Sequence, residues 1–328
     1  MKRAYFYILS FILLVSIGGC KKSAQSGLDT KHRVKRVAIA TLMTHPALDS
    51  IIANMKTDLA EHGYQDGETI QYVIKNANGD SNVAVTLVRE LELSKPDVLV
   101  AITTPVAQVA VKEARSPIVF SAVTDPVGAG VVASLTSPPA NVTGVSDAWP
   151  YLAQLALAKE IVPEAKRLGV VFNPGEAASQ YGIKQIREMA PSVGFELIEV
   201  PVSSTEEILG ALRVRIRGLD AVYLSSDNTV IQGLPAALKV CFDNKKPLFV
   251  GDSGTVEKGG LAAVSVGYAG VGRLSGDLVA RVLNGERGIP IVVAKGDEIF
   301  LNLDTAKRLG INFSPALRAR ATQVFGQP

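Results

Sequence analysis

The stretch 118-IVFSAVTDPVGAG-130 passes from a continuous apolar run into a turn. Residues 118–123 predict a buried strand, because a parallel strand covered on both faces is apolar throughout. The Asp125-Pro126 pair and the glycines that follow then end regular structure, since proline lacks an N–H and restricts the residue before it. Open α/β sheets bind their ligands at the carboxyl ends of such strands. Asp125 therefore has two interpretations, a ligand-binding carboxylate or the cap of a turn.

The alternation of strand and helix continues outward from this stretch in both directions. Helices are expected at about 45–62, 82–93, 205–215, 229–243 and 270–283, and a break rich in turn formers lies at 137–141. Strands are expected at 34–41, 69–74, 97–102, 118–123, 142–145, 167–172, 195–200, 221–224, 248–250, 261–266 and 299–303. This order predicts an α/β protein with βαβ units and mainly parallel sheets, arranged as two similar lobes joined by a hinge.

The sequence predicts four parts along the chain. A signal peptide occupies 1–19, and a lipidated cysteine with a flexible tether occupies 20–33. Lobe I takes 34–144 plus about 264–298, and lobe II with the C-terminal tail takes 145–263 plus about 299–328. The loops at the carboxyl ends of both sheets would face the cleft between the lobes.

The first 20 residues have the pattern of a leader peptide. It has a basic start at Lys2 and Arg3, an apolar segment at 5–17, and small residues directly before Cys20. The apolar segment has the length of a signal peptide and is too short to span a membrane. Small residues before a cysteine are typical of a bacterial lipobox, so we expect a lipid anchor on Cys20 and a body that works outside the cytoplasmic membrane. An ordinary secretory leader with an incidental cysteine is the alternative.

Composition and motifs exclude several classes of function. Hydrophobic residues make up 47% of the 328 residues and charged residues 20%, and the net charge of +3 gives no electrostatic footprint for nucleic acid. Cys20 and Cys241 fit neither a disulfide framework nor a metal site. Neither a nucleotide-binding loop nor a zinc-protease motif occurs, so no cofactor and no metal are expected. The string 251-GDSG-254 occurs in chymotrypsin-like proteases, but that fold is all-β and the three histidines here offer no plausible triad.

Polar side chains follow nearly every predicted strand, whereas the strand interiors are apolar. Thr103 and Thr104 begin a helix, where free N–H groups favour an anion such as a carboxylate. Carboxylates at other strand ends would pair with an ammonium group, so the pattern predicts a site for a zwitterion such as an amino acid. Capping of helices is the alternative role for each residue. The candidate ligand-binding residues are His45, Thr103, Thr104, Asp125, Ser146, Asn173, Asp227, Asn228, Asp252 and Tyr268; Asp147 follows its strand in the same pattern.

Aromatic residues near these loops could form a wall for an apolar side chain, with core packing as the alternative; they are Trp149, Phe172, Tyr181, Tyr223 and Tyr268.

Several strings in a fixed order carry a resemblance that covers about residues 35–315. They are 45-HPALD-49, 102-ITTPVAQ-108, 119-VFSAVTDPVGAG-130, 141-NVTGVSD-147, 172-FNPGE-176, 226-SDNT-229 and 251-GD-252. The chain resembles the ABC-transporter substrate-binding protein family, whose best-known members bind tryptophan or other aromatic amino acids and have the type I periplasmic-binding-protein fold. It departs from the family at Gly267 and Gly270, where members commonly have acidic residues.

The resemblance implies a function of capture rather than catalysis. The protein would bind a small solute, an amino acid such as tryptophan or phenylalanine, and deliver it to the permease of an ABC importer. Its partners would be the solute, the permease subunits and the membrane through the lipid anchor, with no nucleic acid, and it would be a monomer. A ligand-sensing module for a membrane receptor or regulator is the alternative, and a cell-surface hydrolase using Asp or Ser253 is the third hypothesis.

Overall fold

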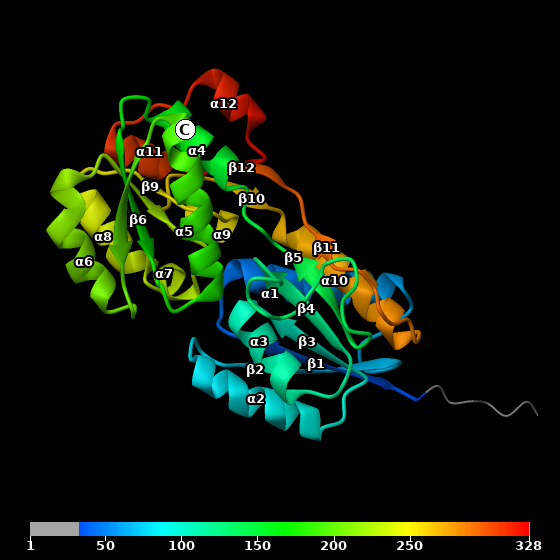
Figure 1. Cartoon of the computed structure of the whole chain (residues 1–328). Helices are drawn as coiled ribbons and strands as arrows, with labels where there is room; N and C mark the ends of the chain where they lie inside the picture. The colour runs from blue at the N-terminus through cyan, green and yellow to red at the C-terminus, as the bar shows by residue number, and fades with distance from the viewer. Residues whose placement is uncertain (1–32, 328) are drawn as a thin grey trace, which may run out of the picture. The chain divides into compact units, whose positions relative to one another are not determined.

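The computed structural model describes residues 33–327; the predicted leader, Cys20 and almost all of the tether lie outside these residues. Between them, the described residues form two parallel sheets and one small mixed sheet, with helices packed on the sheet faces (Figure 1). No helix in this part of the chain is long and apolar enough to cross a membrane.

Lobe I is built around a six-stranded parallel sheet. Its strand order is β11 (Val292–Val293), β5 (Val142–Ser146), β4 (Ile118–Val123), β3 (Val98–Ile102), β1 (Lys35–Thr41) and β2 (Ile70–Asn76). The central strands β3 and β4 are buried along their whole length, which explains their continuous apolar sequence. Helices lie on both faces of the sheet in Figure 1, namely α2 (Ser81–Leu93) and α3 (Thr104–Glu113) on one and α1 (Pro46–Glu61) and α10 (Tyr268–Leu283) on the other.

Lobe II contains the other two sheets. The parallel one has the order β7 (Glu196–Pro201), β6 (Arg167–Phe172), β8 (Ala221–Leu224) and β9 (Leu248–Phe249); the mixed one has the order β10 (Ala262–Val266), β12 (Gly296–Asn302) and β13 (Gln323–Phe325). The helices of this lobe are α4 (Tyr151–Ile161), α5 (Ala177–Met189), α6 (Glu207–Arg215), α7 (Asn228–Gln232), α8 (Leu234–Asp243), α9 (Ser253–Glu257), α11 (Leu303–Leu309) and α12 (Pro315–Arg320).

The chain crosses between the lobes three times among the described residues. The crossings follow β5, follow β10 and follow β11, at about 147–150, 267 and 294–295. Residues 264–266 pair with β12, and 296–298 are part of β12, so all six belong to a lobe II sheet although the sequence assigned them to lobe I. The reason is that β10 is joined to α10 through Gly267 alone and β11 to β12 through 294–295, and no change in composition marks such short connections.

The predicted α/β architecture, two lobes with mainly parallel sheets, is confirmed. One expected helix, 229–243, is instead two helices, α7 and α8, which meet at Gly233. A side chain at Gly233 would lie within 2.1 Å of Ile208, so close packing with α6 favours glycine at this break.

Candidate functional site

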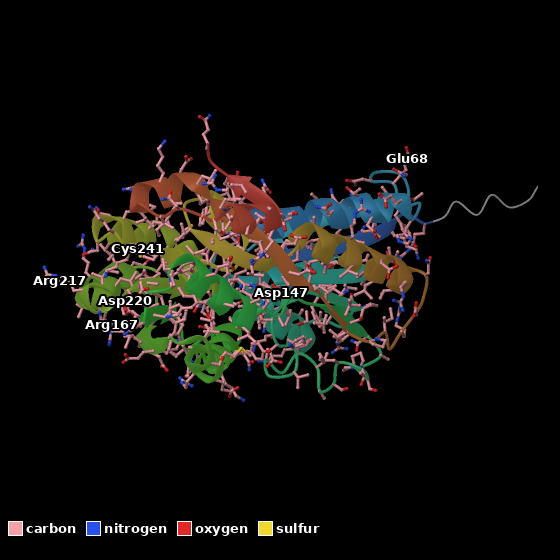
Figure 2. The ribbon with its side chains drawn as sticks, turned by 90° about the horizontal axis from the view of Figure 1, so that it is seen from above. Glu68, Asp147, Arg167, Arg217, Asp220 and Cys241 are labelled. Atoms are coloured by element: carbon pink, nitrogen blue, oxygen red, sulfur yellow. The ribbon has the colours of Figure 1, made fainter. Side chains whose placement is uncertain are left out.

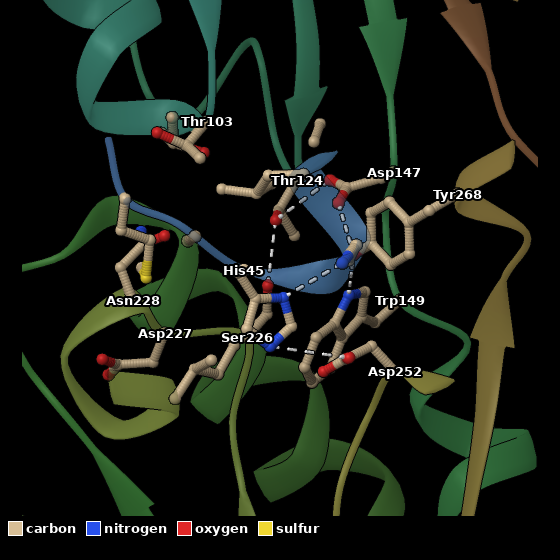
Figure 3. Close-up of a pocket in the computed structure, with 17 residues that line it drawn as sticks. His45, Thr103, Thr124, Asp147, Trp149, Ser226, Asp227, Asn228, Asp252 and Tyr268 are labelled. Atoms are coloured by element: carbon tan, nitrogen blue, oxygen red, sulfur yellow. Dashed lines mark hydrogen bonds and ion pairs between the residues drawn. The ribbon is translucent and has the colours of Figure 1, made fainter. Parts of the chain in front are cut away.

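A cavity lies where the carboxyl ends of the strands of both lobes meet. Its empty space, including the open solvent at its mouth, amounts to about 500 Å³. Lobe I contributes residues that follow β1, β3, β4 and β5, and lobe II contributes residues that follow β8 and β9 (Figure 3). The lining is Met43, His45, Ala47, Leu48, Thr103, Thr104, Ala122, Thr124, Asp147, Trp149, Ala178, Ser226, Asp227, Asn228, Ile231, Asp252 and Tyr268.

Asp147 is the carboxylate at the first crossing between the lobes, and it is 4% exposed (Figure 2). The Tyr268 hydroxyl donates to its Oδ2 at 2.9 Å and accepts from Trp149 Nε1 at 3.2 Å. The Thr124 hydroxyl lies 3.4 Å from its Oδ1. Burial raises the pKa of Asp147 to about 6. No basic side chain of the described residues forms a salt bridge with it, so its ionised form has hydrogen-bond donors but no counter-charge.

The N-terminus of α3 points into the cavity with its donors unused. Thr103 precedes α3 with φ 87° and ψ 155°, a region that a β-branched residue rarely adopts, and its side chain does not cap the helix. Its hydroxyl is buried and has no hydrogen-bond partner in the described structure. On the lobe II side, α5 also begins without a side-chain cap, and its Ala178 lines the same cavity as Thr104. Uncapped helix N-termini favour an anion between them.

Three other helices that begin at the cavity, α1, α7 and α9, have caps, whereas α10, which begins at Tyr268, has no side-chain cap within 33–327. Asp252 caps α9 by accepting from Thr255 N at 2.9 Å, and His45 caps α1 by accepting from Ala47 N at 3.3 Å. At α7, Glu176 reaches over from the start of α5 and accepts from Asn228 N at 3.0 Å. Side chains therefore accept from N–H groups in the first turns of α1, α7 and α9, whereas the first turns of α3 and α5 have no such acceptor among the described residues.

Asp227 lines the cavity but serves the lobe II scaffold. One oxygen accepts from Val230 N at 3.0 Å, and the other accepts from Ser179 Oγ at 2.7 Å and from Asn173 N. Burial, with the charge of Glu176 nearby, raises the pKa of Asp227 to about 7. Because three donors already hold this carboxyl, it is a weaker candidate for a ligand ammonium than Asp147.

The structure brings together seven of the ten candidate residues from the sequence. The cavity is lined by His45, Thr103, Thr104, Asp227, Asn228, Asp252 and Tyr268. The remaining three have other places. Asp125 accepts from Gly128 N at 2.9 Å and caps a turn, Ser146 donates to Thr124 O at 3.2 Å, and Asn173 bonds Thr229 and Gly175. Asp125 is thus outside the cavity lining.

Asp147, Thr124 and Ser226 line the cavity without having been selected as ligand-binding candidates. Asp147 could have been found from the strand-end pattern, in which it follows Ser146 as Asp125 follows Thr124. Of the five aromatic residues considered as a wall, Trp149 and Tyr268 line the cavity, whereas Phe172 and Tyr223 pack in the lobe II core and Tyr181 packs, partly buried, against that core. No group of three or more His, Cys, Asp or Glu side chains within 33–327 could hold a metal ion.

Gly267, where the resemblance leads us to expect an acidic residue, lies beside the carboxylate of Glu298. A Cβ at this position would lie 2.3 Å from Glu298 Oε1, so the glycine makes room for a carboxylate that arrives from β12. Burial raises the pKa of Glu298. Gly270, by contrast, has open space around it. An acidic side chain is therefore present beside this crossing, although from another part of the chain.

Comparison with known proteins places the chain in a family. The profile of the family described as "ABC transporter substrate binding protein" matches residues 36–325. A "Tyrosine-binding protein" of Clostridioides difficile is 31% identical over 94% of this chain and 92% of its own length. A Streptococcus pneumonia ABC domain in complex with L-Trp has a TM-score of 0.85 and 30% identity, covering 89% of this chain and 99% of that one. A ligand-free, open substrate-binding protein with adhesive properties from Clostridium difficile has a TM-score of 0.68 and 33% identity, covering 86% and 97%. The chain therefore belongs to the ABC transporter substrate-binding proteins, which are extracytoplasmic, bind a small-molecule ligand, act with ABC permeases and are not enzymes.

Proposed function

We propose that this protein is a lipid-anchored, monomeric binding protein that captures an amino acid with an aromatic side chain in the interlobe cavity and delivers it to an ABC importer. The observation that carries the proposal is Asp147, a buried carboxylate that faces the cavity without a counter-charge. A buried carboxylate is costly unless a cation or several donors stabilise it. The ammonium group of an amino acid is the cation that the site lacks.

The ligand carboxylate would bind at the N-termini of α3 and α5. Thr104 N–H and Val106 N–H belong to the uncapped first turn of α3, and the unpartnered Thr103 hydroxyl lies beside them. The two helices belong to different lobes, so an anion between them would favour closure. A zwitterion fits this arrangement, with one charge at Asp147 and the other at the helix N-termini.

The remaining wall suits an aromatic side chain. Met43, Leu48 and Ile231 supply apolar surface, and the Trp149 ring is held in place by Gly251, whose Cβ would lie 1.9 Å from it. Apolar and aromatic walls with a few polar groups are typical of small-molecule sites. The relatives named for tyrosine and for L-Trp support the same class of ligand.

Contacts across the lobes support a closed form of the described structure. The Thr124 and Ser226 hydroxyls, from different lobes, lie 3.1 Å apart. Gly254 at the start of α9 faces Pro46 at the start of α1, and a Cβ on it would lie 2.9 Å from Pro46 Cβ. The TM-score is also higher with the L-Trp complex than with the ligand-free, open relative.

Gly254→Ala is expected to weaken amino-acid binding about three- to tenfold without lowering the melting temperature of the unliganded protein. The added methyl meets Pro46 only in the closed arrangement, whereas its 3.3 Å contact with Asp252 Oδ1 lies within lobe II and is present in both forms; alanine is also a better helix former than glycine. Titration calorimetry and thermal unfolding measure the two effects. Gly270→Ala, in open space on α10, is the matched control and should leave affinity unchanged. Unchanged affinity in Gly254→Ala would argue against closure through this contact.

The lipid anchor is tested by Cys20→Ser, which lies outside the described residues. Without the thiol no thioether-linked lipid can form, and since each buried CH₂ contributes about 0.8 kcal/mol, the protein should leave the membrane fraction. Cell fractionation with an antibody measures this. Cys241→Ala is the control, because Cys241 is buried in α8 and unavailable for modification. Membrane attachment that persists in Cys20→Ser would refute the anchor.

Native mass spectrometry of the purified protein tests the ligand class. We expect a co-purified molecule with the mass of an aromatic amino acid, released on denaturation. A co-purified sugar, or saturable binding of an uncharged solute in place of any amino acid, would contradict the proposal.

A further inference from the structure

His45 and Asp252 form a polar pair across the lobes, set in the cavity wall between apolar residues. His45 follows β1 in lobe I, and Asp252 follows β9 in lobe II; they are 8% and 2% exposed. Figure 3 shows the two side chains facing one another. The inference drawn from this pair rests on the proposed function, because it concerns which aromatic amino acid the cavity selects.

The histidine presents a donor to the cavity. Its Nδ1 accepts the Ala47 N–H at 3.3 Å, so the proton of the neutral ring is on Nε2. Burial, together with the charge of Lys258, lowers the pKa of His45, while Asp252 and Asp49 act in the opposite direction. The ring is therefore neutral near pH 7, with one N–H to offer.

The aspartate presents an acceptor. Asp252 Oδ1 accepts from Thr255 N at 2.9 Å, and Oδ2 accepts from the Thr255 hydroxyl. Each oxygen has a further lone pair available. His45 Nε2 lies 3.9 Å from Oδ1, which is beyond the length of a hydrogen bond. The pair therefore leaves a donor and an acceptor that a third group can satisfy together.

A hydroxyl is the group that fits this gap. Its oxygen, about 2.8 Å from both atoms, can accept from Nε2–H and donate to Oδ1. Met43, Leu48 and Ile231 in the cavity lining are apolar, so the hydroxyl must end an apolar body. An indole N–H can donate to Asp252 but cannot accept from His45, and a phenyl ring can do neither.

We propose that His45 and Asp252 recognise the phenolic hydroxyl of the ligand and make L-tyrosine the preferred amino acid of this protein. The names of the relatives do not decide this point, since one is a tyrosine-binding protein and another holds L-Trp at nearly the same identity. A site built to bond a hydroxyl discriminates against the analogue that lacks it, because its own polar groups are then left unpaired.

The test compares L-tyrosine with L-phenylalanine, which differ only in the hydroxyl, by calorimetry on the full chain and on His45→Asn. Asparagine keeps an acceptor for the Ala47 N–H and is a good N-cap, but it removes the Nε2–H donor. We expect the unmodified protein to bind tyrosine about 10- to 100-fold more tightly than phenylalanine, as for a hydrogen bond to a charged group. In His45→Asn this ratio should fall to about threefold or less, with the phenylalanine affinity nearly unchanged.

Asp252→Asn, which also keeps its helix cap, should lower the same ratio and replaces His45→Asn if that variant unfolds. Asp125→Ala, outside the cavity, is the control and should keep the ratio. Equal affinities for both amino acids in the unmodified protein, or an unchanged ratio in both variants, would overturn the inference and leave the proposed function standing. If neither amino acid bound while another solute did, the proposed function would fail and this inference with it.

Discussion

Asp147→Asn is expected to weaken amino-acid binding by about 100-fold or more, equivalent to roughly 3 kcal/mol. Asparagine has the shape of aspartate and can still accept from the Tyr268 hydroxyl, so the packing at the crossing is kept. The variant loses the charge that would face the ligand ammonium in a site 4% exposed to solvent. Loss of one partner from a buried charge pair is costly because the other charge is left without compensation.

Asp125→Ala is the matched control for this experiment. Both residues are aspartates one position beyond a polar residue at a strand end, but Asp125 caps a turn outside the cavity. We expect its substitution to leave affinity within about threefold and to cost about 1 kcal/mol of stability, as for a lost capping hydrogen bond. Calorimetry and thermal unfolding give both values. The reverse result, with Asp125 essential and Asp147 dispensable, would move the ammonium site to the turn after β4.

Amino-acid affinity should fall as the pH is lowered through about 6. Burial raises the pKa of Asp147 to about 6 in the unliganded protein, whereas an ammonium beside it favours the ionised form. Above pH 6 the carboxylate is already ionised, and below pH 6 each bound ligand must displace a proton. The dissociation constant should therefore rise by up to tenfold per pH unit, or about 30-fold between pH 7.5 and 4.5.

Asp147→Asn separates this effect from the other titrating groups in the cavity. Asp227, with a pKa raised to about 7, remains in the variant and would give a change centred near pH 7. Burial lowers the pKa of His45, so its ring gains a proton only at a lower pH than an exposed histidine does. We expect the dependence near pH 6 to disappear in the variant. A dissociation constant that is independent of pH in the unmodified protein, measured by calorimetry, would show that Asp147 does not hold the ammonium.

The architecture was predictable from the sequence because burial of each strand and helix leaves a local pattern of apolar residues. β3 and β4 are covered on both faces, so every residue in them is apolar or small, and the helices between carry their own start and stop residues. The short strands β11 and β13 were not predicted. They add only a pair and a triplet of residues to the edges of sheets, and such lengths leave no periodicity to detect.

The candidate site was predictable as a set of strand ends but not residue by residue. Thr124-Asp125 and Ser146-Asp147 look alike in sequence, yet only the second aspartate lines the cavity. Ala122 has φ 53°, and the pairing of β4 with β5 shifts between Phe120 and Val123; after β4 the chain forms a turn that Asp125 caps. Asp147 instead begins the crossing to lobe II. The turn after β4 is marked in the sequence by Asp125-Pro126 and the glycines, but which of the two aspartates lines the cavity depends on where the strand ends of both lobes meet, and no local pattern encodes that.

Caps that come from distant parts of the chain could not be predicted from the sequence either. Glu176 caps α7 although it precedes Asn228 by a whole βαβ unit, and this occupies donors that sequence reasoning left free for the ligand. The uncapped ends of α3 and α5 became distinguishable from the capped ends only once the tertiary partners were known.

A crystal structure of the protein with its co-purified or added amino acid tests the central claim most directly. We predict the ligand ammonium within hydrogen-bond distance of the Asp147 carboxylate, and the ligand carboxylate at the N–H groups of Thr104 and Val106. A ligand whose ammonium lies away from Asp147, or which presents an uncharged group to it, would contradict the account.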